Sequence, residues 1–249
     1  MKHSEISQAD LDRYEWQLDI PGFGRTGQLA LKNASVLITR CGGLGGVVAY
    51  ELAAAGIGHL ILCHGGNLTI SDLNRQLLMT DGWIGKPRIE SIAQRLKEFN
   101  PTIEVDTFDE NISSENASRF VGMADYIVDC APLFEERFAL NHEAVQERKP
   151  MVDCAMYGME GQITVIKPGV TPCLRCLYPD NPLAWQRRFP VFGAVSGMIG
   201  CMGAVETIKL ITGLGTSLCN VMVYADTMTQ TFQRVAIHRD PACRECKHL

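Results

Sequence analysis

The stretch from Val36 to Gln76 constrains the fold of this chain more than any other part of the sequence. Residues 36–39 form an apolar, largely β-branched run that predicts a buried strand, and the glycine-rich turn 40–46 leads into a helix expected to begin near Val47. A second apolar run, residues 60–63, follows Gly56 and Gly58. Strand, turn, helix and strand in this order form a βαβ unit, which begins a parallel sheet. In such a unit the bare backbone of the turn and the helix N-terminus can bind an anion, usually a phosphate.

The remaining sequence continues this pattern. A short helix is expected over residues 6–20 with Ser7 as its N-cap, and further helices over 89–99, 134–145 and 195–211. Further strands are expected at 103–105, 126–130, 150–155 and 161–166, followed by an antiparallel pair at 221–225 and 232–237. The fold class predicted is α/β: a Rossmann-like, mainly parallel sheet with helices on both faces and an antiparallel continuation. Neither a linker nor an internal repeat is evident, so residues 1–249 are expected to form a single domain.

Composition narrows the class of protein. A chain of 249 residues with 46% hydrophobic content is long enough for one well-buried α/β domain. Its 23 basic and 28 acidic residues give no basic footprint, which argues against a nucleic acid partner. The N-terminus has no signal-peptide pattern, and the long apolar run from Val195 is interrupted by Glu206 and Lys209, which indicates a buried helix and no membrane span. We therefore expect a cytoplasmic protein whose six cysteines outside the CxxC pairs are reduced core thiols.

The strongest chemical motif is a pair of CxxC sequences. Cys173 and Cys176 form the first pair, and Cys243 and Cys246 form the second, 67 positions further along the chain. Two such turns supply four thiolates, the ligand set of a closed tetrahedral zinc site. The alternatives are four thiols without a metal, or a redox pair. We favour a structural Zn²⁺ that fastens the C-terminal tail, because four thiolates leave no open coordination position for catalysis.

Several motifs occur along the chain in one order. They are Arg13-Tyr14-Glu15-Trp16-Gln17, Gly42-Gly43-Leu44-Gly45, Asp72-Leu73-Asn74-Arg75-Gln76, Asn100-Pro101, Gly158-Met159-Glu160-Gly161-Gln162, Pro172-Cys173-Leu174-Arg175-Cys176 and Glu206-Thr207-Ile208-Lys209-Leu210. In this order and over nearly the whole length, the chain resembles the E1-like activating enzymes of the ThiF/MoeB/HesA group. In that group the second CxxC pair also lies near the C-terminus.

The resemblance implies a function. Members of the group bind ATP with Mg²⁺ and adenylate the C-terminal carboxylate of a ubiquitin-like sulfur-carrier protein, and some act on a small carboxylate. They form homodimers, in which the N-terminal segment crosses to the partner subunit. Carried over to this chain, the resemblance implies catalytic roles for Arg75 and Arg88. It implies nucleotide-binding roles for Arg40, Gly42, Gly43, Leu44, Gly45, Asp72, Arg75 and Lys86.

The sequence also departs from the group's motifs. Arg40 replaces the first glycine of the turn, where it either binds a phosphate or carboxylate or fills the pocket. Residues 64–66, His64-Gly65-Gly66, replace an Asp-x-Asp sequence that binds ribose, and His64 is interpreted as a surface or satisfied histidine. The other replacements are Trp16 for an arginine, Asp72 for an asparagine, Arg88 for a lysine and Pro132 for a magnesium-binding aspartate. Asp129 either binds a metal in place of that aspartate or caps the turn that follows its strand, and we favour the cap.

These departures leave two hypotheses of different classes. The first is an adenylyltransferase with a rebuilt nucleotide site. It would act without a covalent thioester, because residues 177–200 contain no cysteine and Cys201, which follows them, is interpreted as a buried core thiol. The second is a catalytically silent relative, a pseudoenzyme that binds a carrier protein or another ligand. An NAD-dependent oxidoreductase fits poorly, because the acid expected at the end of the second strand is missing.

Overall fold

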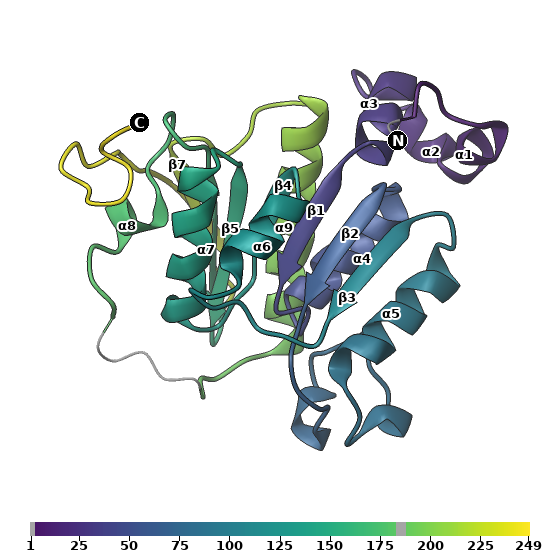
Figure 1. Cartoon of the computed structure of the whole chain (residues 1–249), viewed down its shortest axis with the longest axis horizontal. Coiled ribbons are helices and arrows are strands. Elements are labelled where there is room, and N and C mark those ends of the chain that lie inside the picture. Colours follow the sequence, from purple (N-terminus) through teal and green to yellow (C-terminus); the bar gives the residue numbers. More distant parts are fainter. Residues whose placement is uncertain (1–2, 183–187) are drawn as a thin grey trace.

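The computed structural model describes residues 3–182 and 188–249. Its centre is one eight-stranded sheet in the order β3-β2-β1-β4-β5-β6-β7-β8 (Figure 1). The strands are β1 (Ser35–Thr39), β2 (His59–Cys63), β3 (Glu104–Phe108), β4 (Tyr126–Asp129), β5 (Met151–Tyr157), β6 (Glu160–Ile166), β7 (Val221–Asp226) and β8 (Thr231–Ala236). Strands β1 to β5 pair in parallel, and β5 to β8 pair antiparallel. The predicted parallel sheet with an antiparallel continuation is confirmed.

Helices lie on both faces of this sheet, also as predicted (Figure 1). They are α1 (Gln8–Arg13), α2 (Glu15–Leu18), α3 (Gly24–Lys32), α4 (Gly45–Ala55), α5 (Arg88–Phe99), α6 (Ala117–Met123), α7 (Phe134–Gln146), α8 (Leu174–Leu177) and α9 (Gly193–Thr212). Two short 3-10 turns, η1 (Ile70–Asp72) and η2 (Asp81–Trp83), lie between β2 and α5. Helices α4, α5 and α9 pack on one side of the sheet, and α6 and α7 pack on the other.

The two helical layers explain why β1 has apolar residues at consecutive positions. In β1, Val36 and Ile38 contribute to the core under α4 and α9, whereas Leu37 between them contributes to the core under α6 and α7. Side chains alternate across a strand, so a strand covered on both faces needs apolar residues at every position. The unbroken run at 36–39 therefore predicts a central strand, and β1 is central.

Helix α9 packs closely because it is rich in small residues. A Cβ atom on Gly200 would lie 2.8 Å from the Leu44 carbonyl oxygen, and one on Gly203 would lie 2.8 Å from the Cys154 Sγ. By length and composition α9 could pass for a membrane span. In this fold it packs between α4 and strand β5, in the manner of a core helix of a globular protein.

Three local expectations need correction or addition. The helix expected over 6–20 is two short helices, although Ser7 caps the first as predicted, in a reciprocal arrangement with Asp10. Helix α6 was not expected from the sequence. Cys201 is exposed on α9 and is not the buried thiol that was expected, while Cys219 is only partly buried.

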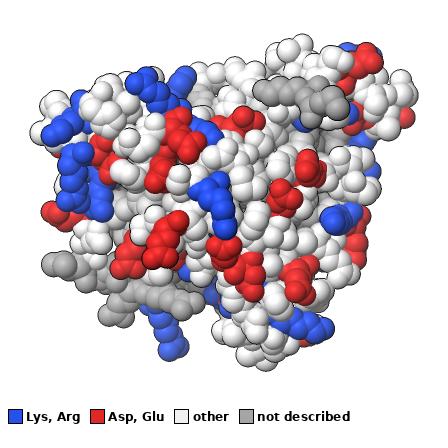
Figure 2. Space-filling view, viewed as in Figure 1, with Lys and Arg blue, Asp and Glu red and all other residues white. Residues whose placement is uncertain are grey.

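On the face shown in Figure 2, acidic and basic side chains are interspersed.

Candidate functional site

A cavity of about 740 Å³ opens where the parallel strands end. Arg40 and the glycine turn follow β1, His64 follows β2 and Ala131 follows β4, and each of them lines the cavity. The carboxyl ends of parallel strands are the usual ligand-binding edge of such sheets. The arginines that line it are Arg40, Arg75, Arg88, Arg137 and Arg188, and Asp72 is the one lining carboxylate among the described residues. This balance of charge favours an anionic ligand.

Arg40 is held in a strained backbone conformation by a buried ion pair. Its φ is +54°, in the left-handed region that favours glycine. Its guanidinium forms a two-point contact with Glu136 of α7, in which Arg40 Nε donates to Oε2 at 2.7 Å. Glu136 is buried. Arg40 therefore contributes a neutralised charge to the cavity wall and joins the glycine turn to α7.

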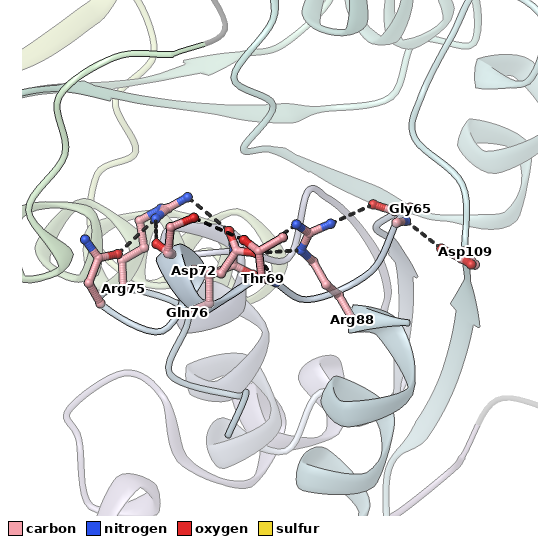
Figure 3. A network of polar contacts seen from close by, with 10 residues as sticks. Gly65, Thr69, Asp72, Arg75, Gln76, Arg88 and Asp109 are labelled. Carbon is pink, nitrogen blue, oxygen red and sulfur yellow. Dashed lines mark hydrogen bonds and ion pairs between the residues drawn. The ribbon is translucent and has the colours of Figure 1, made fainter. Parts of the chain in front are cut away.

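Asp72 connects two arginines at the cavity wall (Figure 3). Its Oδ2 accepts hydrogen bonds from Arg88 Nη2 at 2.8 Å and from the Thr69 N–H and hydroxyl, each at 2.9 Å. Its Oδ1 accepts from Gln76 Nε2 at 2.8 Å and from Arg75 Nη2 at 3.2 Å. Burial acts to raise the pKa of Asp72, but the Thr69 and Arg88 contacts outweigh it and lower the pKa. One carboxylate thus fixes two guanidinium groups and leaves one positive charge uncompensated.

His64 is neither on the surface nor satisfied, contrary to its interpretation from the sequence. It is 5% exposed, and its Nδ1 has no hydrogen-bond partner among the described residues. Burial lowers the pKa of His64 to about 3, and the positive charges of Arg88 and Arg40 act in the same direction. The cavity therefore contains a neutral imidazole.

In the cavity wall, Arg137 of α7 lies between two buried carboxylates. Its Nη2 donates to Asp153 Oδ1 at 2.6 Å, and its Nε is 3.4 Å from Asp129 Oδ2. Asp129 Oδ1 accepts from the Ala131 N–H at 2.9 Å, so Asp129 caps the turn after β4 as expected. Burial raises the pKa of Asp129 to about 6, against the attraction of Arg137. Asp129 and Asp153 thus share a single arginine, Arg137, and the three side chains support the cavity wall.

Comparisons with known proteins identify the family of this fold. Residues 14–245 match the ThiF family. The chain belongs to the ThiF family, whose members are E1-like. It is 46% identical to "Protein HesA, heterocyst" of Trichormus variabilis over 97% of this chain and 90% of that protein. It is 37% identical to "Adenylyltransferase and sulfurtransferase MOCS3" of Drosophila yakuba over 98% of this chain and 55% of that protein. The structure of Escherichia coli MccB with AMPCPP and MccA has a TM-score of 0.82 at 25% identity, over 98% of this chain and 76% of MccB.

In this ThiF-family chain most of the nucleotide-site residues inferred from the sequence come together. Those that line the cavity are Arg40, Gly42, Gly43, Leu44, Asp72, Arg75 and Arg88. Gly45 starts α4 behind them, where a Cβ atom would lie 2.7 Å from the Arg40 carbonyl oxygen. Lys86 is not a lining residue: it is exposed, and its Nζ lies 5.2 Å from the centre of the Trp83 ring. The roles of these residues stay predictions.

Several residues of the site were missed by sequence reasoning. Gln76, Glu136 and Arg137 each make a contact that shapes the cavity, and Asp153 fixes Arg137 from the neighbouring strand. Gln76 lies next to Arg75 in the motif of residues 72–76, so the motif could have indicated it as a site residue. Arg188 also lines the cavity and is exposed.

The four cysteines of the CxxC pairs meet in a second site away from the cavity. The Sγ–Sγ distances are 3.9 Å for Cys173–Cys176, 3.7 Å for Cys173–Cys243 and 3.5 Å for Cys176–Cys246. A tetrahedron with Zn–S bonds of about 2.3 Å needs Sγ–Sγ distances of about 3.8 Å. The cluster could therefore hold a metal ion such as zinc.

Contacts around this cluster hold the C-terminal tail. Arg239 donates to the carbonyl oxygens of Gly169 at 3.0 Å and Cys246 at 2.8 Å. His142 Nδ1 of α7 lies 2.7 Å from Glu245 Oε1. The tail is thus joined to the main sheet domain at the cysteines and at two further points.

Proposed function

We propose that this chain binds ATP in the arginine-lined cavity and adenylates a carboxylate, the C-terminal carboxylate of a ubiquitin-like sulfur-carrier protein or a small carboxylate. The observation that carries the proposal is the cavity itself, in which the glycine turn and two fixed arginines, Arg75 and Arg88, lie at one ligand-binding edge. Two relatives add support, since MOCS3 is named an adenylyltransferase and MccB has been crystallised with AMPCPP, an adenine nucleotide. We also propose that the chain forms a homodimer and acts in the cytoplasm.

The proposed reaction needs no nucleophilic side chain. A carboxylate oxygen of the acceptor attacks the α-phosphorus of ATP, the bond from that phosphorus to the bridging oxygen breaks, and pyrophosphate leaves with the electron pair. The developing negative charge would be stabilised by Arg75 and Arg88, whose planar guanidinium groups suit phosphate oxygens. Positioning of the two reactants in the cavity supplies the remainder of the acceleration. The exposed thiol of Cys201 has no role in this scheme.

A protein-held magnesium ion does not fit the donors of this cavity. Hard oxygen ligands, above all carboxylates, are what Mg²⁺ prefers. Among the described lining residues the one carboxylate is Asp72, and both of its oxygens already accept hydrogen bonds from Thr69, Gln76 and the two arginines. We therefore assign neutralisation of the phosphates to the arginines and derive no step through a metal ion.

A second candidate function is a silent relative that binds a carrier protein or another ligand without adenylating it. The observation that favours it is the same network, because a nucleotide must compete with Asp72 for Arg75 and Arg88, and with Glu136 for Arg40. In this case the cavity would keep its arginines for structural support.

Calorimetric titration with ATP, with and without Mg²⁺, separates the two candidates. Micromolar binding that Arg75→Ala and Arg88→Ala each weaken by roughly 10- to 100-fold would support the adenylating function. Arg95→Ala, which removes an exposed arginine of α5, is the matched control and should leave binding unchanged. Pyrophosphate exchange with candidate carriers is the next measurement. Wild-type protein that binds a carrier but not ATP would establish the silent relative instead.

A further inference from the structure

Three side chains that can each ligate a metal ion meet at the edge of the sheet. They are His59, Glu104 and Asp106, and one ligand atom of each lies within 4.8 Å of the others. His59 begins β2, whereas Glu104 and Asp106 belong to the edge strand β3. The arginine-lined cavity lies at the other end of these strands, where His64 follows β2. The group is therefore separate from the cavity.

The pairing of β2 with β3 places the three side chains on one face of the sheet. In the parallel register His59 pairs with Glu104, and Ile61 pairs with Asp106. Side chains alternate across a strand. Ile61 contributes to the core under α6 and α7, whereas Val105 packs against the core on the other side. His59, Glu104 and Asp106 therefore point to the same face as Ile61, and the sheet fixes the spacing of their backbones.

Solvent reaches this face at the beginning of the two strands. Phe108, at the end of β3, packs against Phe120 of α6 and covers the far end of the strand. At the near end the His59 and Asp106 side chains are 23% and 44% exposed, and Glu104 is exposed as well. A metal ion can therefore reach all three ligand atoms without any rearrangement of the fold.

The charges of the group are not balanced. Asp106 Oδ2 lies 3.0 Å from His59 Nε2, and within the described ranges 3–182 and 188–249 neither Asp106 nor Glu104 forms an ion pair with a lysine or arginine. Like charges that are neighbours on one face of a sheet destabilise it. Charged side chains on an edge strand also prevent pairing with another chain, but that role requires no imidazole between two carboxylates. The imidazole distinguishes this group from an acidic surface patch.

We propose that His59, Glu104 and Asp106 bind a divalent transition metal ion, Zn²⁺, as three protein ligands and leave the fourth coordination position to water. Zinc binds imidazole nitrogen and carboxylate oxygen at about 2.0–2.2 Å, so the ligand atoms of a tetrahedral site lie about 3.4 Å apart. The separation of 3.0 Å between His59 and Asp106 is close to this value, and rotation of the exposed Glu104 side chain completes the set. The imidazole favours zinc over Mg²⁺ and Ca²⁺, which prefer oxygen ligands. The ion would link the edge strand to β2.

The experiment is calorimetric titration of the full chain with Zn²⁺, after gel filtration and elemental analysis have established how much zinc the cysteine cluster already holds. We expect one further Zn²⁺ to bind with micromolar affinity. His59→Ala, Glu104→Gln and Asp106→Asn should each weaken this binding by at least roughly 10-fold, because each variant removes one ligand. Excess Mg²⁺ should not displace the ion. All three side chains are at least partly exposed, so we expect the variants to fold.

The controls are His238→Ala, which removes an exposed histidine outside the group, and Glu98→Gln, which changes an exposed carboxylate of α5. Both should bind Zn²⁺ as the wild-type protein does. A wild-type protein that takes up no zinc beyond that of the cysteine cluster would overturn the site. Unchanged affinity in any of the three ligand variants would also overturn it. Displacement of the ion by Mg²⁺ would do the same, because it would indicate an acidic patch without a contribution from the imidazole.

Discussion

At the scale of the residue, Arg40 combines backbone strain with a buried ion pair, and the two effects can be separated. An L-residue in the left-handed conformation costs about 1–2 kcal/mol, while removal of one partner of a buried ion pair costs about 3–5 kcal/mol. We expect Arg40→Gly to relieve the strain at φ +54° and to leave Glu136 buried without its partner. The net result should be a free energy of unfolding lower by roughly 2 kcal/mol.

Urea unfolding monitored by circular dichroism would measure this change. The double variant Arg40→Gly/Glu136→Gln is the control, because it removes the strain together with the unpaired charge. It should be more stable than Arg40→Gly alone. A single variant as stable as the double variant would show that the ion pair contributes nothing to holding Arg40 in its conformation.

The pair of buried acids gives a pH dependence at the same scale. Burial raises the pKa of Asp129 to about 6 from an ordinary value of 3.8, so the folded protein binds this proton more readily than the unfolded chain. The resulting stability is fully present below pH 3.8 and is lost as the pH rises through 6. Asp129→Asn mimics the protonated acid and does not lose this stability. Its free energy of unfolding relative to wild type should therefore rise between pH 3.8 and pH 6, by up to roughly 1.4 kcal/mol per pH unit.

Unfolding by urea at pH 4, 5, 6 and 7 would test this expectation. Asp109→Asn, which changes an exposed carboxylate beside the Gly66 N–H, is the matched control and should show a pH dependence close to wild type. A constant difference between Asp129→Asn and wild type across the series would contradict the raised pKa.

Residue-level prediction from the sequence succeeded where a motif is local. Gly42, Gly43 and Arg75 belong to two local motifs, and all three line the cavity. The partner of Arg40 is 96 positions away on α7, and no local pattern in the sequence connects the two. The sequence shows only that Asp72 replaces an asparagine of the group, whereas the structure shows that two arginines contact its carboxylate.

At the scale of the element, we expect the C-terminal tail to depend on the four-cysteine cluster. Burial raises the pKa of the Cys173 thiol, and the neighbouring Cys176 adds to this, so four thiolates at one place require a cation. We expect the purified protein to contain close to one zinc per chain. Removal of the metal by a chelator should lower the midpoint of thermal unfolding and expose the tail to proteolysis, because a structural zinc contributes directly to folding.

Elemental analysis and limited proteolysis followed by mass spectrometry would measure both effects. Cys246→Ser should release the metal and the tail, whereas Cys201→Ser changes an exposed cysteine outside the cluster and should do neither. Zinc-free protein with an equally protected tail would show that Arg239 and the His142–Glu245 contact are sufficient to hold it.

Elements were predicted well where apolar periodicity was strong. The two exceptions have different causes. The segment expected as one helix over 6–20 is interrupted at Tyr14, whose buried side chain accepts a hydrogen bond from Asn100 Nδ2 at 3.0 Å. Helix α6 spans only seven residues and contains Gly122, so its periodic signal is weak. A tertiary contact that the local sequence does not encode thus accompanies the first interruption, and a weak local pattern explains why α6 was not predicted.

At the scale of the whole molecule, the N-terminal helices have an exposed apolar surface that another subunit could cover. Trp16 is 91% exposed, an unusual position for the largest apolar side chain, and Ile20 is exposed nearby. If the homodimer of the proposed function forms through this segment, light scattering should give a mass of about 55 kDa, twice the 27.5 kDa of one chain.

Trp16→Glu should shift the protein toward the monomer, since it places a charge in an apolar contact. Val170→Glu changes an exposed apolar residue next to Gly169, whose carbonyl oxygen accepts from Arg239 of the C-terminal tail, and should not alter the mass. A monomeric wild-type protein would contradict the dimer, and an unchanged dimer in Trp16→Glu would place its interface elsewhere.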